Sequence, residues 1–342
     1  MPAMNRRIVL ARRPGPEGVT PDCFRLEEAP KPVPGPGELL IRVLWLSCDP
    51  AMRGWIAEGP NYSAPVPLGG AMRSFTVGRV EASNHPDYPV GCHVAGRQGW
   101  QLWAVSDASD IDRIVDPDLA PLSANLHLLG MTGLTAYQGL IQVGQPRPGE
   151  TVVVSTAAGA VGSVVGQVAK ILGCRAVGLT GSAAKVADCT ELYGYDVALN
   201  YRDFAGTDAL SAALAEACPD GVDIYYDMTA GWISDAVMPH LNVGARIAVV
   251  GTMAIPSSPP PTGPRVQRDL LVKRATMAGF LVLDHFDTLE PTVETLAGWY
   301  RDGRIRTRED VSDGLESAPA ALMKLLEGSN RGKVLVRLPE SE

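Results

Sequence analysis

The segment that decides the fold reads Thr151-Val-Val-Val-Ser-Thr-Ala-Ala-Gly159-Ala-Val-Gly162-Ser-Val-Val-Gly166. An apolar, strand-sized run ends at Thr156, and glycine-spaced residues that open a helix follow it at once. A strand, a glycine-rich turn and a helix in this order are typical of the phosphate-binding entrance of a dinucleotide-binding βαβ unit. The partial positive charge of a helix N-terminus favours a pyrophosphate there. The segment therefore predicts a Rossmann cofactor domain.

Each glycine of this turn has an expected role. Gly159 is expected to permit the tight turn, Gly162 to let backbone N–H groups approach the pyrophosphate, and Gly166 to allow close packing of the helix on the strand. Ala157 stands where the usual G-x-G-x-x-G pattern has its first glycine. The assignment therefore depends on the predicted strand before the turn and on the repeated βα units after it.

Strand-sized apolar runs alternate with helical patterns over residues 151–282, which is the βαβ signature of a doubly wound parallel sheet. Near-continuous hydrophobicity predicts strands covered on both faces, at Thr151–Thr156, Arg175–Thr180, Val197–Tyr201, Asp223–Met228, Arg246–Gly251 and Met277–Val282. Helical spacing predicts the helices between them, at Ala160–Leu172, Ala183–Tyr193, Thr207–Ala217 and Ile233–Leu241. Helix stops follow at Gly173, Gly194, Pro219 and Gly244.

The flanking parts of the chain have a different character. Short alternating stretches such as Leu39–Leu46, set between Pro/Gly turns, predict a small β barrel or sandwich in the first 130 residues. The tail carries a helix at Ala318–Leu326 and a strand at Lys333–Leu338, which we expect to return to the first domain. The predicted domains are 1–130 together with 305–342, and 131–304.

Composition excludes several classes of function. Hydrophobic residues make up 46% and charged residues 20%, as in an ordinary globular protein, and the net charge of -8 offers no basic stripe for nucleic acid. No apolar run is long enough for a membrane span, and no secretory signal is apparent. The six cysteines are scattered, which favours reduced thiols and a cytoplasmic location. We expect a small-molecule partner.

The end of the second predicted strand selects the cofactor. NAD-specific sites place an acidic residue there to hold the ribose 2′-hydroxyl. None occurs over residues 175–187, where the chain instead reads Thr180-Gly-Ser-Ala-Ala-Lys185. This leaves room for a 2′-phosphate and predicts NADPH, although Lys185 is equally open to interpretation as a solvated helix lysine.

No metal site is expected. The five histidines do not pair with cysteines at zinc-ligand spacings, so Cys48 and Cys92 are interpreted as buried small hydrophobes and His93 as a satisfied domain residue.

Several blocks in a fixed order resemble one family. The sequence is similar to the zinc-independent medium-chain reductases, the branch of leukotriene B4 dehydrogenase/prostaglandin reductase, plant alkenal double-bond reductases and bacterial curcumin reductase. The resemblance spans nearly the whole chain and is carried by Asp22-Cys-Phe-Arg-Leu26, Asp49-Pro-Ala-Met-Arg-Gly54, Ser83-Asn-His-Pro86, Gly130-Met-Thr-Gly-Leu-Thr-Ala-Tyr137, the Gly159 turn, Asn200-Tyr-Arg202, Ala278-Gly-Phe280 and Gly328-Ser-Asn-Arg-Gly-Lys333.

The resemblance implies a GroES-like β-barrel domain, built from the N-terminal part and the C-terminal tail, beside the Rossmann domain. It implies a homodimer in which NADPH lies between the domains and delivers hydride to the β-carbon of an α,β-unsaturated carbonyl compound. Lys185 and Tyr201 would meet the 2′-phosphate and residues 160–163 the pyrophosphate. The cofactor contacts that it implies are Pro50, Met131, Thr132, Gly159, Ala160, Val161, Gly162, Ser163, Gly181, Ser182, Lys185, Tyr201, Met228, Val250, Gly251, Thr252, Phe280, Leu281, Val282 and Asn330.

Three positions depart from the family. Ala51 replaces the tyrosine of Asp-Pro-Tyr-Met-Arg, Met228 replaces the asparagine of Phe-Asp-Asn, and the tyrosine of the loop after the fifth strand falls near Pro256. Ala51, Tyr62 and Pro256 are therefore the expected substrate-pocket residues, in a pocket widened for a bulky substrate. Tyr62 is the candidate catalytic donor, with ordinary loop packing as the alternative.

Two other functions stay open. A reductive cyclase would let the carbanion formed by hydride addition close a ring in a polyene natural product. A non-catalytic NADPH-binding protein would keep the cofactor site without turnover.

Overall fold

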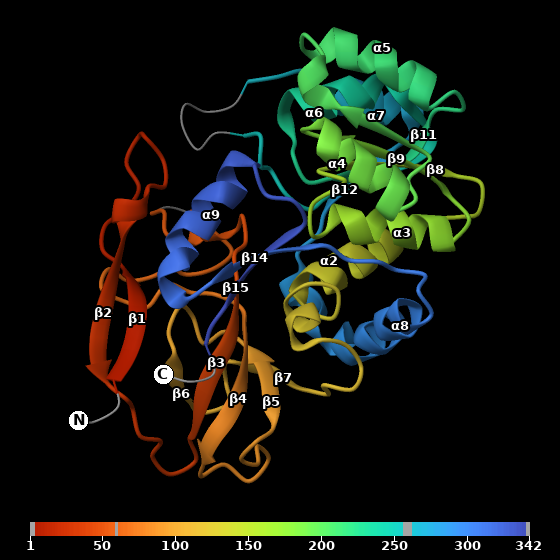
Figure 1. Cartoon of the computed structure of the whole chain (residues 1–342). Helices are drawn as coiled ribbons and strands as arrows, with labels where there is room; N and C mark the ends of the chain where they lie inside the picture. Colours follow the sequence, from red (N-terminus) through yellow and green to blue (C-terminus); the bar gives the residue numbers. More distant parts are fainter. Residues whose placement is uncertain (1–3, 59–60, 256–261, 340–342) are drawn as a thin grey trace. The chain divides into compact units, whose positions relative to one another are not determined.

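A computed structural model describes residues 4–58, 61–255 and 262–339 of the chain (Figure 1). The chain forms two compact units, which we call the β-rich unit (Met1–Gly130 with Arg308–Glu342) and the Rossmann unit (Met131–Thr307). In the described ranges no helix has the length and apolar character that a membrane crossing demands.

A six-stranded parallel sheet forms the centre of the Rossmann unit, in the order β10-β9-β8-β11-β12-β13. This is the doubly wound order of dinucleotide-binding domains, in which the strand order reverses between β8 and β11. The predicted Rossmann fold is confirmed. The strands are β8 (Thr151–Ser155), β9 (Arg175–Thr180), β10 (Val197–Asn200), β11 (Val222–Asp227), β12 (Leu241–Val249) and β13 (Thr276–Gly279).

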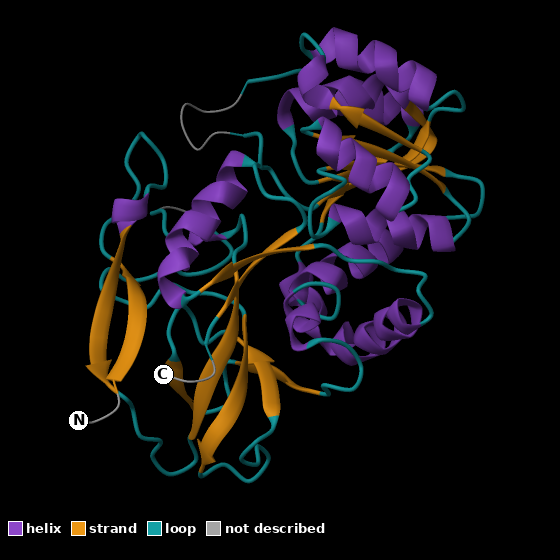
Figure 2. Cartoon of the chain, in the orientation of Figure 1, coloured by secondary structure: helices purple, strands orange, loops and turns teal. Residues whose placement is uncertain are grey.

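Helices cover both faces of this sheet (Figure 2). Buried Val153, Tyr225 and Ile247 pack with one group of helices, while Tyr226, which points to the other face, donates its hydroxyl to the Thr135 carbonyl at 2.7 Å. The helical elements are α2 (Met131–Gly139), η3 (Leu140–Gly144), α3 (Gly162–Ile171), α4 (Ala183–Ala187), η4 (Asp188–Leu192), η5 (Tyr201–Asp203), α5 (Thr207–Ala217), α6 (Gly231–Val237), η6 (Met238–His240), α7 (Gln267–Lys273), η7 (Val282–Thr288) and α8 (Leu289–Arg301).

The structure corrects three details of the sequence prediction. Gly244 does not end a helix, because it lies inside β12 with φ +81°. β13 is not covered on both faces: it is a four-residue edge strand with mostly exposed residues, and the predicted part from Phe280 to Val282 lies beyond it. α7 and α8 were not predicted, although α8 runs for thirteen residues.

Antiparallel pairing dominates the β-rich unit. One sheet has the order β14-β15-β3-β4-β5-β7, with β6 also paired to β3, and β1 and β2 form a separate antiparallel pair. Its elements are β1 (Met4–Leu10), η1 (Pro21–Cys23), β2 (Phe24–Pro30), β3 (Leu39–Ser47), α1 (Met52–Trp55), β4 (Thr76–Ser83), β5 (His93–Gly96), β6 (Trp103–Ser106), β7 (Ile111–Val115), η2 (Leu122–Leu126), β14 (Glu309–Asp313), η8 (Leu315–Ser317), α9 (Ala318–Glu327) and β15 (Lys333–Arg337).

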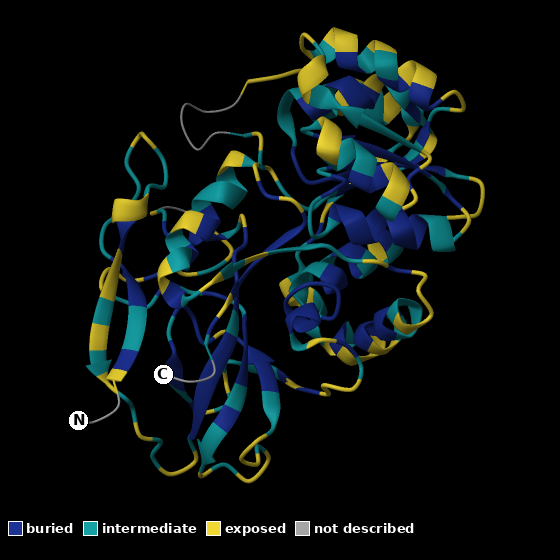
Figure 3. Ribbon diagram, in the orientation of Figure 1, coloured by how far each residue is buried: buried dark blue, intermediate teal, exposed yellow. Residues whose placement is uncertain are grey.

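β3 organises the β-rich unit. It pairs with β4, β6 and the C-terminal strand β15, which confirms that the tail returns to the first domain. The predicted alternation of buried and exposed residues in this strand is wrong, because nearly every residue of β3 is buried (Figure 3). A strand that is paired on both edges and covered on both faces has no solvent side left.

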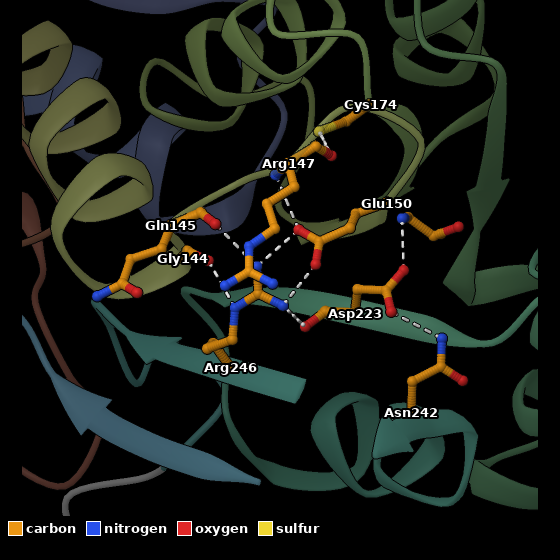
Figure 4. Close-up of polar contacts among 9 residues, drawn as sticks. Gly144, Gln145, Arg147, Glu150, Cys174, Asp223, Asn242 and Arg246 are labelled. Atoms are coloured by element: carbon orange, nitrogen blue, oxygen red, sulfur yellow. Dashed lines mark hydrogen bonds and ion pairs between the residues drawn. The ribbon is translucent and has the colours of Figure 1, made fainter. Parts of the chain in front are cut away.

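Arg246 in β12 ties the amino ends of the Rossmann strands to the helix that precedes β8 (Figure 4). Its guanidinium donates to both carboxylate oxygens of Glu150, at 2.9 and 2.6 Å, and to the carbonyls of Gly144 and Gln145 at 2.8 and 2.9 Å. Although burial alone would raise the pKa of Glu150, this bidentate partner holds it below the usual value. The network therefore stabilises the end of the sheet at which the amino ends of the strands lie.

Close packing of α3 gives a stability prediction. A Cβ on Gly166 would lie 2.1 Å from the ring of buried Tyr195, whereas a Cβ on Gly298 in α8 would meet no atom within 4 Å. We expect Gly166→Ala to lower the free energy of unfolding by about 1–3 kcal/mol through overpacking. Gly298→Ala should raise it by about 0.5–1 kcal/mol, as alanine does in a helix. Urea unfolding of both variants is the measurement, and equal effects would contradict the packing argument.

Candidate functional site at the carboxyl edge of the parallel sheet

The turn after β8 is built from backbone hydrogen bonds. Gly159 N–H donates to the Thr156 carbonyl at 2.8 Å, and Ser163 N–H donates to the Gly159 carbonyl at 2.9 Å. Thr156, not Gly159, takes the left-handed conformation, with φ +49°. α3 begins at Gly162, and the partial positive charge of a helix N-terminus suits an anion. The predicted pyrophosphate contacts Ala160 to Ser163 therefore lie at this helix start.

Glycine is required here by the protein's own packing. A Cβ on Gly162 would lie 2.4 Å from the Thr156 carbonyl oxygen. Gly166 packs on Tyr195, and the Tyr195 hydroxyl donates to the Gly162 carbonyl at 2.6 Å. The predicted close approach at Gly166 is therefore present, but its partner is a tyrosine that precedes β10 rather than a strand.

A polar cluster follows the end of β9, where residues 181–187 include no Asp or Glu. Ser182 caps α4 and accepts from the Lys185 backbone N–H at 3.3 Å. Gly181 adjoins Tyr201, since a Cβ on this glycine would lie 2.6 Å from the tyrosine hydroxyl. The two residues predicted to meet the 2′-phosphate, Lys185 and Tyr201, thus lie in two segments, which follow β9 and β10 respectively.

Sequence reasoning missed Arg202 in this cluster. Its Nε lies 3.5 Å from the position of a Gly181 Cβ, and the residue is exposed. The available signal was its place directly after Tyr201, in the quoted Asn200-Tyr-Arg202 block. A guanidinium here would add the bidentate donors that a phosphate prefers.

The remaining strand ends carry the other predicted contacts. Met228 follows β11, is buried, and donates its N–H to Ser155 Oγ at 2.7 Å. Gly251 packs against the Met228 carbonyl, and Phe280 N–H donates to the Val249 carbonyl at 2.9 Å. Because all six strands are parallel, their carboxyl ends meet at one sheet edge, and that edge also carries Val250, Thr252, Leu281 and Val282.

Met131 and Thr132 open α2, which packs against β11 and η7. Thr135 Oγ donates to the Met131 carbonyl at 2.7 Å within the first turn. Gly139 makes the close contact with the sheet, since a Cβ there would lie 2.5 Å from the Tyr226 hydroxyl. α2 also contacts η7, the segment that follows the carboxyl end of β13.

The β-rich unit holds the remaining predicted residues. Pro50 is exposed and Ala51 half-buried at the start of α1, while Asn330 is buried before β15, where its side-chain amide donates to the Gly332 carbonyl at 2.8 Å. Pro256 lies outside the described residues.

Tyr62 has a neighbourhood that suits a proton donor. The residue is 52% exposed. Partial burial raises its pKa above the ordinary value, with Asp49 acting in the same direction, while the adjacent Trp55 indole N–H and Arg73 act in the opposite one. The Tyr62 hydroxyl is therefore protonated at neutral pH.

Comparison with known proteins places the chain among oxidoreductases. Residues 6–114 match the family described as "N-terminal domain of oxidoreductase", and residues 160–298 match the one described as "Zinc-binding dehydrogenase". The NADPH-dependent curcumin reductase of Escherichia coli (strain K12) is 43% identical over 98% of this chain and 97% of its own length. The chain belongs to the medium-chain dehydrogenase/reductase family.

Two further members of this family support the assignment to its reductase branch. The 2-alkenal reductase (NADP(+)-dependent) of Nicotiana tabacum is 38% identical over 88% of both chains. The crystal structure of CurA from Vibrio vulnificus in complex with NADPH superposes with a TM-score of 0.90 at 38% identity, covering 98% of this chain and 99% of that one. The expected resemblance is confirmed.

The name of the second matched family raises the question of zinc. Burial raises the pKa of the Cys48 thiol to about 12, and the thiol donates to the Ala318 carbonyl at 3.9 Å. Cys92, predicted to be buried, is only partly buried, and that partial burial also raises the pKa of its thiol. Zinc is bound by thiolate, so both environments disfavour the ligand form. Residues 4–58, 61–255 and 262–339 contain no group of three or more His, Cys, Asp or Glu side chains that could hold a metal.

We expect this family member to work without zinc. Prolonged chelation should leave its turnover and its thermal unfolding temperature unchanged, because the part of the chain that the structure describes contains no set of zinc ligands. Elemental analysis of the purified protein and assays before and after chelation are the measurements. Activity lost on chelation and restored by zinc alone would contradict this expectation.

Proposed function

We propose that this protein is an NADPH-dependent oxidoreductase that reduces the activated C=C bond of an α,β-unsaturated carbonyl compound. One observation carries the proposal: the carboxyl edge of the sheet combines the glycine-rich turn that opens α3 with residues 181–187, which include Ser182 and Lys185 but no carboxylate and whose Gly181 adjoins Tyr201 and Arg202. This edge belongs to a chain that is 43% identical to a curcumin reductase over nearly its full length.

The residues of the Rossmann unit fit NADPH. The N-terminus of α3 would hold the pyrophosphate, and the cluster after β9 and β10 would hold the 2′-phosphate through a cation and hydroxyl groups. When bound, NADPH would supply the hydride that attacks the β-carbon of the substrate. The contacts after β11, β12 and β13, with Pro50, Met131, Thr132 and Asn330, would orient the nicotinamide half.

A test of the phosphate assignment compares the two nicotinamide cofactors. Lys185→Ala should weaken NADPH binding about tenfold or more and leave NADH binding almost unchanged, since it removes one charge-assisted contact. Arg301→Ala, at the exposed end of α8, is the matched control and should change neither affinity. Titration calorimetry with both cofactors measures the effect, and equal weakening of the two would reduce Lys185 to a structural role.

Tyr62 is proposed as the donor to the carbonyl oxygen. Negative charge develops on that oxygen as the β-carbon accepts hydride, and a hydroxyl aimed at it stabilises the charge. Exposure of half the side chain leaves the hydroxyl within reach of a ligand, and its raised pKa keeps the proton on it.

Replacement of Tyr62 should change the pH profile as well as the rate. Because its pKa is raised, wild-type kcat should fall only when the hydroxyl ionises, at a pH above the range in which an ordinary tyrosine titrates. Tyr62→Phe should lower kcat about 10²-fold at neutral pH and remove that alkaline fall. Tyr88→Phe in the same unit is the control. An unchanged kcat in Tyr62→Phe would exclude the proposed role.

A bulky substrate is proposed from the pocket residues. Ala51 presents a methyl group where the family places tyrosine, and it packs partly buried against the core that includes Met52 and Trp55. A tyrosine contributes a large apolar body and a hydroxyl. Without it, short enals gain few remote contacts to hold the reacting carbon in place.

A graded series of enones tests both the reaction and the pocket. NADPH consumption should rise in kcat/KM from short enals to bulky conjugated ketones, and Ala51→Tyr should shift the preference back. Ala51→Leu adds volume without a hydroxyl and separates the two effects. A wild-type preference for the shortest enal would sink the bulky-substrate proposal. Cyclised products would favour the reductive cyclase, and no consumption with any enone would favour a binding protein.

We also propose a homodimer formed through the open edge of the Rossmann sheet. β13 is the last strand, and the apolar side chains of Leu271 and Val272 on α7 and of Met277 on β13 are exposed. An open edge beside exposed apolar side chains favours pairing with another strand. Antiparallel pairing of two β13 strands about a two-fold axis would extend the sheet and cover these side chains.

A cytoplasmic location is proposed on the state of the cysteines. All six are free thiols, and five of them are buried. Disulfide-free chains with buried thiols are typical of reducing compartments.

A further inference from the structure

A buried ammonium group lies at the start of the C-terminal strand. Lys333 is 2% exposed, and its Nζ donates to Ser47 Oγ at 2.6 Å, to the Cys48 carbonyl at 2.9 Å and to Asp49 Oδ1 at 2.7 Å. An ammonium has three N–H donors, so all of them have acceptors.

The carboxylate of the pair is held on both of its oxygens. Ser47 Oγ, which accepts from Lys333, donates to the other oxygen of Asp49. The Asp49 side chain is 10% exposed. Ser47, Asp49 and Lys333 thus form a closed buried network, which we call the Lys333 network.

This network fixes the segment that presents Pro50 and Ala51. Ser47 ends β3, and α1 begins directly after Ala51. The Asp49 carbonyl accepts from Met52 N–H at 3.0 Å. Because Ser47 and Lys333 hold the Asp49 side chain, the exposed Pro50 ring and the Ala51 methyl that follow it are held in one place.

The same lysine also fixes the segment that carries Asn330. The backbone N–H of Lys333 donates to the Arg308 carbonyl at 2.9 Å. The adjacent Gly332 has φ +90°, and a Cβ there would lie 2.2 Å from the same carbonyl oxygen. The Asn330 amide donates to the Gly332 carbonyl at 2.8 Å. One residue therefore joins two chain segments that are almost three hundred positions apart.

Folding stability alone does not account for a buried ion pair. Replacing such a pair with apolar residues of similar volume is often neutral or stabilising, because desolvation offsets most of the Coulomb attraction. What the charges supply is a single geometry, since each donor has one acceptor at a fixed distance.

We propose that Lys333 is a positioning residue for the nicotinamide half of the cofactor, acting through the segments that carry Pro50 and Asn330. The inference rests on the proposed function, from which the assignment of those two contacts comes. A misplacement of about 1 Å is enough to slow a transfer step about 10²-fold, so a rigid anchor has a direct effect on rate.

The test replaces the network with apolar side chains and measures binding. In Ser47→Ala/Asp49→Leu/Lys333→Met, calorimetry should find NADPH binding weakened at least about fivefold, and binding of 2′,5′-ADP, which lacks the nicotinamide, changed by less than about twofold. The matched control is Asp313→Asn/Arg337→Gln, which removes an exposed ion pair from β14 and β15. Equal changes for NADPH and 2′,5′-ADP, or none for either, would overturn the proposal.

Two further measurements test the proposal if the triple variant does not fold, and separate it from the proposed function. If the triple variant fails to fold, Ser47→Ala, which removes one acceptor of Lys333, should give the same selective loss at about threefold. Turnover by wild-type protein reports on the proposed function separately: a wild type that reduces no enone refutes the reaction, while the ratio of NADPH to 2′,5′-ADP affinities still decides the role of Lys333.

Discussion

The close approach of α3 to its surroundings is the constraint on which the Rossmann unit depends. Gly162 and Gly166 carry no Cβ, so the helix can begin against the Thr156 carbonyl and lie on the Tyr195 ring. The Tyr195 hydroxyl then donates to the Gly162 carbonyl. The N-terminus of the helix, with its partial positive charge, consequently lies at the carboxyl edge of the sheet, where the ends of the other five strands meet. A side chain at either position would force α3 to shift, because it would collide with the Thr156 carbonyl or the Tyr195 ring.

The two units divide the proposed work according to their chemistry. The Rossmann unit offers helix N–H groups, hydroxyls and cations, which suit the phosphates of a dinucleotide. The β-rich unit offers a half-exposed phenol at Tyr62, a small pocket residue at Ala51 and a buried ion pair that anchors the neighbouring backbone. Binding energy from the phosphates can thus be used to hold the reacting end in place.

Local patterns predicted local structure well. Thr207–Ala217 and Arg175–Thr180 were predicted with the bounds that the structure has, because periodicity and stop residues are properties of short segments. The contacts of Arg202 with Gly181 and of Lys333 with Asp49 were not predictable from the sequence. Each contact joins two segments that are far apart in the chain, and hydrophobic periodicity describes only one short segment at a time. α8 was missed although its apolar spacing is helical, and β13 was assigned too long because hydrophobicity alone does not mark a sheet edge. The site residues beyond the glycine turn came from the family resemblance rather than from spacing.

The most direct measurement of the proposed reaction follows the hydride itself. NADPH carrying deuterium at both C4 positions would be incubated with the protein and a bulky enone, and the product would be analysed by NMR. The account predicts a saturated ketone with one deuterium on the former β-carbon. Deuterium on the carbonyl carbon, in an allylic alcohol whose C=C bond is intact, would contradict it.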